Sequence, residues 1–229
     1  MIPNYSENNH LILVGKVASE KTFSHEVYGE KFYSFNLEVP RLSETSDVIP
    51  VTISERLITE ELNIGKKVVV EGQFRSYNGY ENEKNKLVLT VFAKEITFKP
   101  EEESEEDKEL TSNEVVLSGY ICKKPIYRQT PFKREIADIL LAVNRAYNKS
   151  DYIPCIAWGR NARFCQNIEV GTEAKIVGRV QSRGYEKKLE DGTVLNKVAY
   201  EVSIISMEVI NKEENENKEE NQEENQEAI

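Results

Sequence analysis

The sequence has little of the side-chain chemistry on which most enzymes depend. Only two of its 229 residues are histidines, His10 and His25, and no G-x-x-x-x-G-K-[ST], H-E-x-x-H or G-x-S-x-G motif occurs. Carboxylates are abundant, but their dense clusters lie in segments that cannot hold an acid/base pair or a metal in fixed geometry. These absences indicate a protein that is not an enzyme, and they give no support for a metal site or a cofactor.

Cysteine and long apolar runs are also scarce. The three cysteines, Cys122, Cys155 and Cys165, are odd in number and form no C-x-x-C pair, which argues against a disulfide framework and a zinc site. No apolar run approaches the roughly 20 residues needed to span a bilayer, and the amino terminus has no apolar core of signal-peptide length. We therefore expect a soluble, cytoplasmic protein that has no membrane partner.

The formal net charge is -10, but the acidity is concentrated in two short segments. Residues 100–109 contain seven acidic residues against one Lys, and residues 211–229 contain eight against two. By contrast, residues 110–210 carry 15 Lys and Arg against 11 Asp and Glu. Neither acidic segment has apolar spacing that can pack, so we expect a disordered linker over 100–110 and a disordered tail over 211–229. A helical tail would be polar all round and only marginally stable.

The sequence does contain an internal duplication. Identical residues coincide when the chain is shifted by 104 positions, and further along the shift becomes 106. The pairs are Asn9 and Asn113, Leu13 and Leu117, Gly15 and Gly119, Leu37 and Leu141, Val39 and Val143, Arg41 and Arg145, Ser46 and Ser150, Asp47 and Asp151, Ile49 and Ile153, Pro50 and Pro154, Arg56 and Arg160, then Gly65 and Gly171, Gly72 and Gly178, Ser76 and Ser182. This pattern predicts two tandem domains, over 1–99 and 111–210, each long enough for its own core.

Each copy contains five segments rich in Val, Ile and aromatic residues, separated by Gly, Pro, Asn and Asp, which predicts five strands. In the second copy they are VVLSGYI, ADILLAVN, DYIPCIAW, EAKIVGRVQS and KVAYEVSIISMEVI, and a short helix is expected between the third and fourth. The first copy repeats this order, with its helix in SERLITEELNI. We therefore predict an all-β chain of two tandem five-stranded OB-fold barrels, each with a short helix between strands 3 and 4. The stretch SRGYEKKLEDGT predicts an extended hairpin arm on the second barrel.

One part of the second copy resembles a known family. The segment KREIADILLAVNRAYNKSDYIPCIAWGRNARFCQNIEVGTEAKIVGRVQSRGY closely resembles the bacterial single-stranded DNA-binding protein family, including the Trp-Gly that ends the third strand and the Gly-Arg-x-x-x-Arg in the fourth. Residues 113–210 fit that pattern throughout, and residues 9–98 fit it more weakly. The resemblance implies a protein that coats and protects exposed single strands in DNA replication, recombination or repair.

The family stacks bases on four aromatic positions, which the resemblance assigns to Tyr147, Tyr152, Trp158 and Tyr185. The assignment is physically reasonable because a base offers a flat face to any exposed ring, with little sequence preference. Nearby cations that would neutralise phosphates are Arg128, Lys133, Arg134, Arg145, Lys149, Arg160, Arg163, Arg179, Arg183, Lys187 and Lys188. Two alternatives stay open: Trp158 and Tyr152 as core residues, and the cations as an ordinary solvated surface.

The first copy lacks rings at the matching positions, which are Ser43, Val48, Ser54 and Gly79. We expect its aromatic platform to be degenerate and its domain mainly to scaffold or to mediate assembly. A weaker contact through its remaining tyrosines and cations is the alternative; these are Tyr77, Tyr80, Arg41, Lys66, Lys67 and Arg75.

The resemblance also implies partners and a location. Relatives assemble four barrels around a strand, so a chain with two barrels is expected to form a homodimer, associated with the nucleoid. Replication or repair proteins are the expected protein partners, although the tail ends in Gln-Glu-Ala-Ile and not in the family's Asp-rich and Pro-Phe tip. The alternatives are an OB-fold adaptor of the primosome, which acts mainly through protein contacts, and an RNA-binding protein, since stacking alone does not sense a 2′-hydroxyl.

Overall fold

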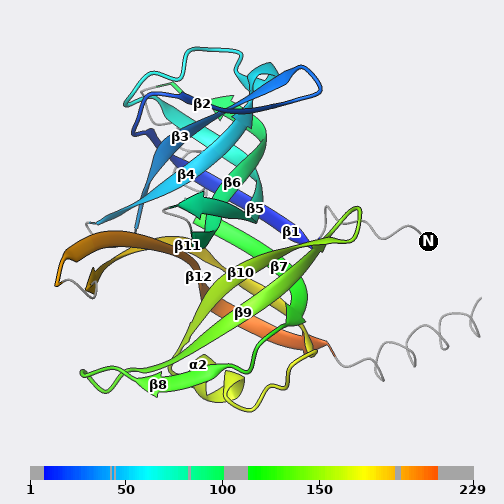
Figure 1. Cartoon of the computed structure of the whole chain (residues 1–229), viewed down its shortest axis with the longest axis vertical. Helices are drawn as coiled ribbons and strands as arrows, with labels where there is room; N and C mark the ends of the chain where they lie inside the picture. The colour runs from blue at the N-terminus through cyan, green and yellow to red at the C-terminus, as the bar shows by residue number, and fades with distance from the viewer. Residues whose placement is uncertain are drawn as a thin grey trace, which may run out of the picture.

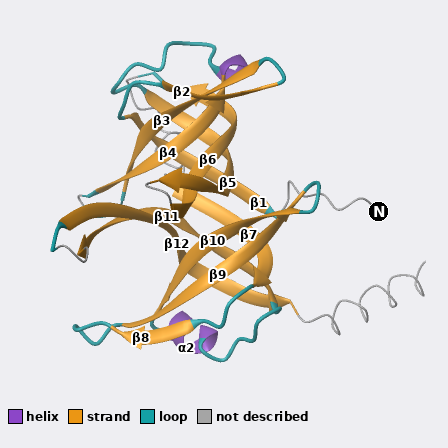
Figure 2. Ribbon diagram, viewed as in Figure 1, coloured by secondary structure: helices purple, strands orange, loops and turns teal. Residues whose placement is uncertain are grey.

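The computed structural model describes residues 8–41, 43, 45–81, 84–100, 113–188 and 192–210. Within these residues the fold is almost entirely β-strand, arranged as two barrels that lie end to end (Figures 1 and 2). The predicted tail over 211–229 lies outside the described residues, as does the predicted linker apart from residue 100. No helix in the described part of the chain is long and apolar enough to cross a membrane.

Each barrel is built from six strands. The first comprises β1 (Asn9–Val17), β2 (Thr22–Val27), β3 (Glu30–Pro40), β4 (Ser46–Ser54), β5 (Lys67–Glu81) and β6 (Lys84–Phe98), with the 3-10 helix η1 (Glu55–Leu57) after β4. The second comprises β7 (Asn113–Ile121), β8 (Ile126–Gln129), β9 (Glu135–Arg145), β10 (Lys149–Trp158), β11 (Glu173–Lys188) and β12 (Val194–Ile210), with helix α2 (Arg160–Cys165) after β10.

The strand pairing closes two five-membered rings. In the first barrel β1 pairs with β3 and β5, β3 with β4, and β4 in parallel with β6, which returns to β5. The second barrel repeats this ring with β7, β9, β10, β12 and β11. This is the strand arrangement of the predicted OB-fold barrel, and it confirms the tandem all-β prediction.

A strand in each barrel and the helix of the first barrel differ from the prediction. Strands β2 and β8 were missed, because every residue of β2 is exposed and β8 is only four residues long, so neither has the alternating apolar pattern of a half-buried strand. Both pair on the outside of the ring, with β3 and β9 respectively. The helix predicted in SERLITEELNI is wrong beyond the single turn of η1, since the β-branched Ile58 and Thr59 that follow have low helix propensity.

Glycines allow the strands to bend into rings, as the sequence predicts. A Cβ on Gly119 would lie 2.3 Å from the carbonyl oxygen of Ala142, where β7 crosses to β9. The register of β11 against β12 shifts between Val177 and Gly178, and that of β5 against β6 shifts at the matching position, Gly72. These bulges produce the sharp bend that closes a short-stranded barrel.

The two barrels join through one continuous sheet. Strand β1 pairs antiparallel with β7, in a register that places Asn9 opposite Leu117 and Leu13 opposite Asn113. Because the paired residues exchange roles between the two copies, the contact has pseudo-two-fold symmetry, as in an isologous dimer. The apolar core extends from one barrel to the other across this pair, including Leu11, Leu13, Val115 and Leu117.

Buried aspartates reinforce the junction on both sides. Asp47 accepts hydrogen bonds from the Ser182 backbone N–H at 2.6 Å and its Oγ at 3.0 Å. At the pseudo-equivalent place, Asp151 accepts one from the Ser76 N–H at 2.7 Å, while Ser76 Oγ accepts one from the Tyr152 N–H. Each aspartate therefore ties its own barrel to the other.

Candidate nucleic-acid interface

Tyr147 occupies the turn of the β9–β10 hairpin. Tyr147 and Asn148 both have positive φ, 61° and 53°, which non-glycine residues adopt rarely and mainly in tight turns. The turn lifts the Tyr147 side chain clear of the barrel, so it is 94% exposed. The ring is held outward by backbone geometry, at the end of a well-paired hairpin.

Tyr152 and Trp158 lie on the outer face of β10. Asp151, Ile153 and Cys155 alternate inward and are buried, which directs Tyr152 to the opposite face. Trp158, the last residue of the strand, faces outward as well. The two rings are 46% and 39% exposed, so neither is a core residue, and the core alternative for them does not hold.

Tyr185 lies on the hairpin arm of the second barrel. Strand β11 continues through Ser182 to Lys188, and Tyr185 pairs with Lys197 of β12. The long β11–β12 hairpin is the predicted arm, whose tip at 189–191 is outside the described residues. The Tyr185 ring is 40% exposed on this arm.

Four of the eleven predicted cations have carboxylate partners. Arg128 contacts Asp138 at 2.8 Å, Arg163 contacts Glu135 at 2.8 Å, and Arg183 lies 3.4 Å from Glu201. Arg145 lies 3.4 Å from Asp151 without hydrogen-bond geometry. These partners reduce the positive charge that the sequence count suggested around the rings.

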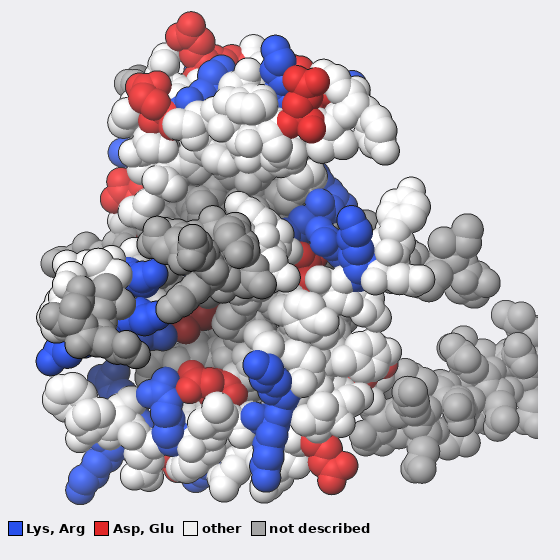
Figure 3. Space-filling model, viewed as in Figure 1, with Lys and Arg blue, Asp and Glu red and all other residues white. Residues whose placement is uncertain are grey.

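The other seven cations form no ion pair with another described residue. They are spread over the β8–β9 turn, the β9–β10 hairpin, helix α2 and the β11–β12 arm, and they are Lys133, Arg134, Lys149, Arg160, Arg179, Lys187 and Lys188. Arg179 is partly buried and the other six are exposed. Figure 3 shows Lys and Arg side chains over the second barrel and gathered at its junction with the first.

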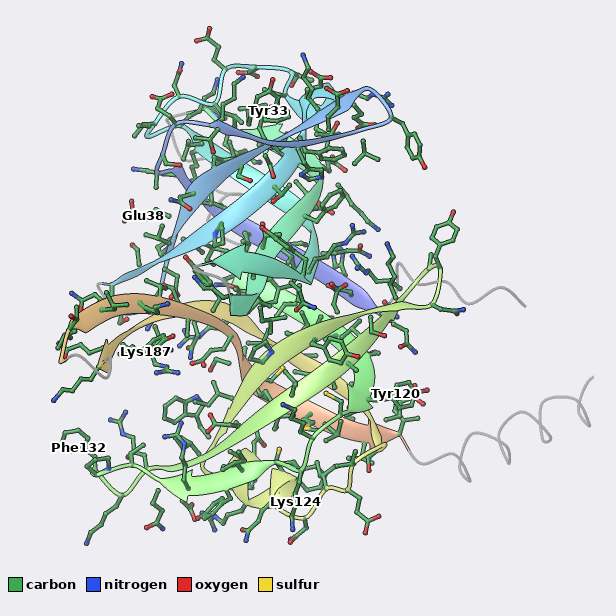
Figure 4. All side chains as sticks on the ribbon, viewed as in Figure 1. Tyr33, Glu38, Tyr120, Lys124, Phe132 and Lys187 are labelled. Atoms are coloured by element: carbon green, nitrogen blue, oxygen red, sulfur yellow. The ribbon has the colours of Figure 1, made fainter. Side chains whose placement is uncertain are left out.

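Phe132 is an exposed ring that the sequence analysis missed. It lies at the tip of the β8–β9 turn, beside Lys133 and Arg134, and is 87% exposed. In Figure 4 the β8–β9 turn with Phe132 and the arm with Lys187 both project to the left of the view. The sequence carried a signal for it, since an aromatic residue between Pro131 and two cations is typical of an exposed turn.

A comparison with known proteins finds a family whose model matches the second barrel. The model of the "Single-strand binding protein family" matches residues 112–210. The match contains the four predicted rings and all eleven predicted cations.

Individual relatives cover a smaller part of the chain. Single-stranded DNA-binding protein 2 of Listeria innocua is 37% identical over 81 residues, 32% of this chain and 51% of the relative. Single-stranded DNA-binding protein A of Bacillus subtilis is 37% identical over 83 residues, 33% of this chain and 48% of the relative. The chain therefore spans about half the length of the curated relatives that it matches.

A solved structure matches both barrels. The wild-type single-stranded DNA binding protein from Thermus aquaticus has a TM-score of 0.69 over 89% of this chain and 93% of its own, at 18% identity. At that identity the likeness establishes the fold alone, a tandem of barrels.

Proposed function

We propose that this protein binds single-stranded DNA, coating and protecting exposed strands in replication, recombination or repair. The observation that carries the proposal is the set of outward rings on the second barrel, Tyr147, Tyr152 and Trp158, which lie along one hairpin among exposed cations. The family match over residues 112–210 supports it and favours it over a primosomal adaptor. The protein would act by binding, without catalysis.

The mechanism follows from the chemistry of the surface. Cations capture the phosphate backbone and release its counterions, so binding weakens with salt at a slope of roughly 0.7 for each phosphate neutralised. The rings then stack on unpaired bases without hydrogen bonds to base edges, which makes binding tolerant of sequence. A duplex keeps its bases stacked inside the helix and cannot use the rings.

Trp158 is the natural reporter because it is the only tryptophan of the chain. Adding oligo(dT) should quench its fluorescence, oligo(U) should show whether the site discriminates against RNA, and duplex DNA should leave the signal nearly unchanged. No quenching by oligo(dT) at low salt would refute the proposal.

Replacing Tyr147, Tyr152 and Trp158 together by Ala should weaken oligo(dT) binding by at least about 3 kcal/mol, more than a hundredfold in Kd, at about 1 to 3 kcal/mol for each ring. Binding is followed by mobility shift, since the reporter is lost. Tyr28→Ala is the matched control, because Tyr28 is a fully exposed tyrosine on a turn of the first barrel. A triple variant that folds and binds like the control would contradict the stacking mechanism.

The proposed assembly is a homodimer that presents four barrels to the strand, located with the nucleoid in the cytoplasm. Replication or repair proteins are its proposed protein partners. Analytical ultracentrifugation of the full chain tests the dimer, and a pull-down with and without nuclease separates partners held by DNA from those held by the protein.

A further inference from the structure

The first barrel carries a row of stacked rings on positions other than those that the second barrel uses. The rings of His25 and Phe32 stack at 4.8 Å with 4° between their planes, and Phe32 lies 5.7 Å from Phe92. The guanidinium of Arg75 covers the Phe92 ring at 4.1 Å. The row therefore runs over β2, β3, β6 and β5 of the first barrel.

This row lies on the outer face of the first barrel, the same face that bears rings in the second. Ser54 occupies the place of Trp158, and its neighbour across the β3–β4 pair is Phe32. In the second barrel, Trp158 pairs with Ile136. At this place the second barrel has its aromatic residue on β10, whereas the first has none on the equivalent strand β4 but has one on the adjacent strand β3.

At the Arg75 end, the row opens into a cleft between the barrels. The cleft has a volume of about 340 Å³ and is lined by both barrels: Gln73, Arg75, Lys94, Arg145, Ala146, Tyr147 and Lys149. Figure 3 shows the basic side chains gathered at this junction, beside the β9–β10 hairpin at the right of the view. The exposed ring of Tyr147 stands at its edge, so the cleft is continuous with the site on the second barrel.

Like charges are crowded in the cleft without enough carboxylate to balance them. Four cations line the cleft, and no Asp or Glu is among its described lining residues. The buried carboxylate of Asp151 lies near Arg145 and Arg75, and the Arg145 Nε–H lacks a hydrogen-bond partner among the described residues. Burial, together with the neighbouring charge of Arg145, lowers the pKa of Arg75. Burial and the charge of Arg75 likewise lower the pKa of Lys94. A polyanion in the cleft would relieve this repulsion.

The pseudo-equivalent junction on the other side lacks this character. There Arg41 is satisfied by Asp47 at 2.6 and 2.7 Å, and it also donates to the Ser182 carbonyl oxygen. Gln181 and Ser203 stand in place of Arg75 and Phe92, and Gln181 donates to Glu201. Arg179 takes the place of Gln73, and Glu201 forms an ion pair with the neighbouring Arg183. Among the described residues, the cleft at Arg75 holds four cations beside the exposed ring of Tyr147, whereas at the other junction Arg41 is paired with Asp47.

We propose that a single strand leaving the second barrel continues through this cleft onto the first, with its phosphates on Arg75, Lys94 and Lys149 and a base on the exposed ring of His25, which stacks on Phe32. This inference rests on the proposed function and adds a direction to it, because the strand crosses between the barrels on one side. It also assigns a binding role to the first domain, which the sequence alone predicted to be a scaffold.

The test uses the full chain and oligo(dT) of about 10 and about 30 nucleotides, lengths that one and two barrels accommodate. R75Q/K94Q should lose about tenfold or more in affinity for the 30-mer and much less for the 10-mer. Its salt slope on the 30-mer should fall by roughly 1.4, which is 0.7 for each of two phosphates. The control K16Q/K21Q removes the same charge from exposed positions of the first barrel that do not line the cleft.

Quenching of Trp158 distinguishes failure of the proposed path through the cleft from failure of the proposed function. If both double variants keep the quenching and bind the 30-mer equally, the path through the cleft is overturned while the proposed function stands. If the unchanged chain shows no quenching, the proposed function itself fails. Tighter 30-mer binding by R75Q/K94Q would also overturn the path, since the cleft would then repel rather than hold the strand.

Arg75 packs on Phe92, so a second pair of variants guards against misfolding. Lys94→Glu alters an exposed side chain and should by itself weaken 30-mer binding selectively. Phe32→Leu removes the ring that supports His25 but keeps an apolar side chain beside Phe92. The unfolding midpoint in urea is measured for each, and a folded Lys94→Glu that binds the 30-mer as tightly as the unchanged chain contradicts the inference.

Discussion

Asp47 offers the sharpest test of how the two barrels are held together. Its carboxylate is fully buried and accepts four hydrogen bonds, two from Arg41 of its own barrel and two from Ser182 of the other. Asp47→Ala leaves the Ser182 N–H without a hydrogen-bond acceptor and the Arg41 charge uncompensated. Removing one member of a buried ion pair costs about 3 to 5 kcal/mol. Because the Arg41 side chain is 28% exposed and can reach water, we expect the lower end, about 3 kcal/mol.

For a chain of this size, a loss of about 3 kcal/mol lowers Tm by roughly 6 to 12 °C, which differential scanning calorimetry measures directly. Asp138→Ala is the matched control, because it removes an Asp–Arg pair of similar length from the surface and should cost no more than about 1 kcal/mol. The reasoning is refuted if Asp47→Ala lowers Tm no further than Asp138→Ala does.

Two further predictions concern pH and the acidic tail. Burial alone would raise the pKa of Asp47, but hydrogen bonds from Arg41 and Ser182 outweigh this effect and lower the pKa. The ionised Asp47 carboxylate therefore stabilises the fold fully above about pH 3.9, the pKa in the unfolded chain, and this stabilisation is lost as the pH falls through the folded pKa. Burial raises the pKa of Asp151, so stability falls as pH rises past the unfolded value. Asp47→Asn should therefore flatten the acid limb of Tm against pH and cost more at pH 7 than Asp151→Asn; equal costs would contradict this. Deleting residues 211–229 should tighten oligo(dT) binding at low salt by removing eight carboxylates that compete for the cations, and an unchanged Kd there would argue against the competition.

The sequence predicted the two barrels because their evidence is local and repeated. Alternating apolar residues such as Leu37, Val39 and Ile49 recur at a fixed offset, and all are buried in the core. Strands β2 and β8 could not be predicted in the same way, because their pairing depends on an edge offered by β3 and β9 and not on a buried face of their own. The regular pairing around Tyr185 was hard to predict for a related reason, since the β11–β12 pairing extends well beyond the apolar part of either strand.

The candidate site was predictable in its rings but not in its charges. Alternation along DYIPCIAW is enough to direct Tyr152 outward, and the turn residues around Tyr147 are visible in the sequence. Whether an arginine is available to a phosphate depends on which carboxylate folding brings beside it. Arg128 and Asp138 are ten residues apart, and Arg163 and Glu135 are 28 apart, so the sequence did not reveal these pairs.

The duplication explains which residues stayed the same in both copies. At a pseudo-two-fold junction each contact occurs twice, so the same side chain is required at both positions. Asp47 and Asp151 both bind a serine N–H across the junction, and Asn9 and Asn113 each bridge a bulged strand, through Phe74 and Val180.

The outer faces are under no such constraint, because in the proposed complex the strand meets each of them once. A ring can therefore leave one strand and return on the next, as Ser54 and Phe32 do relative to Trp158 and Ile136. Aligning the two copies position by position therefore indicates that the first barrel has lost its aromatic platform, although its outer face still carries aromatic side chains. What a stacking surface requires is an exposed ring within reach of the next base, and several positions on a barrel face can provide it.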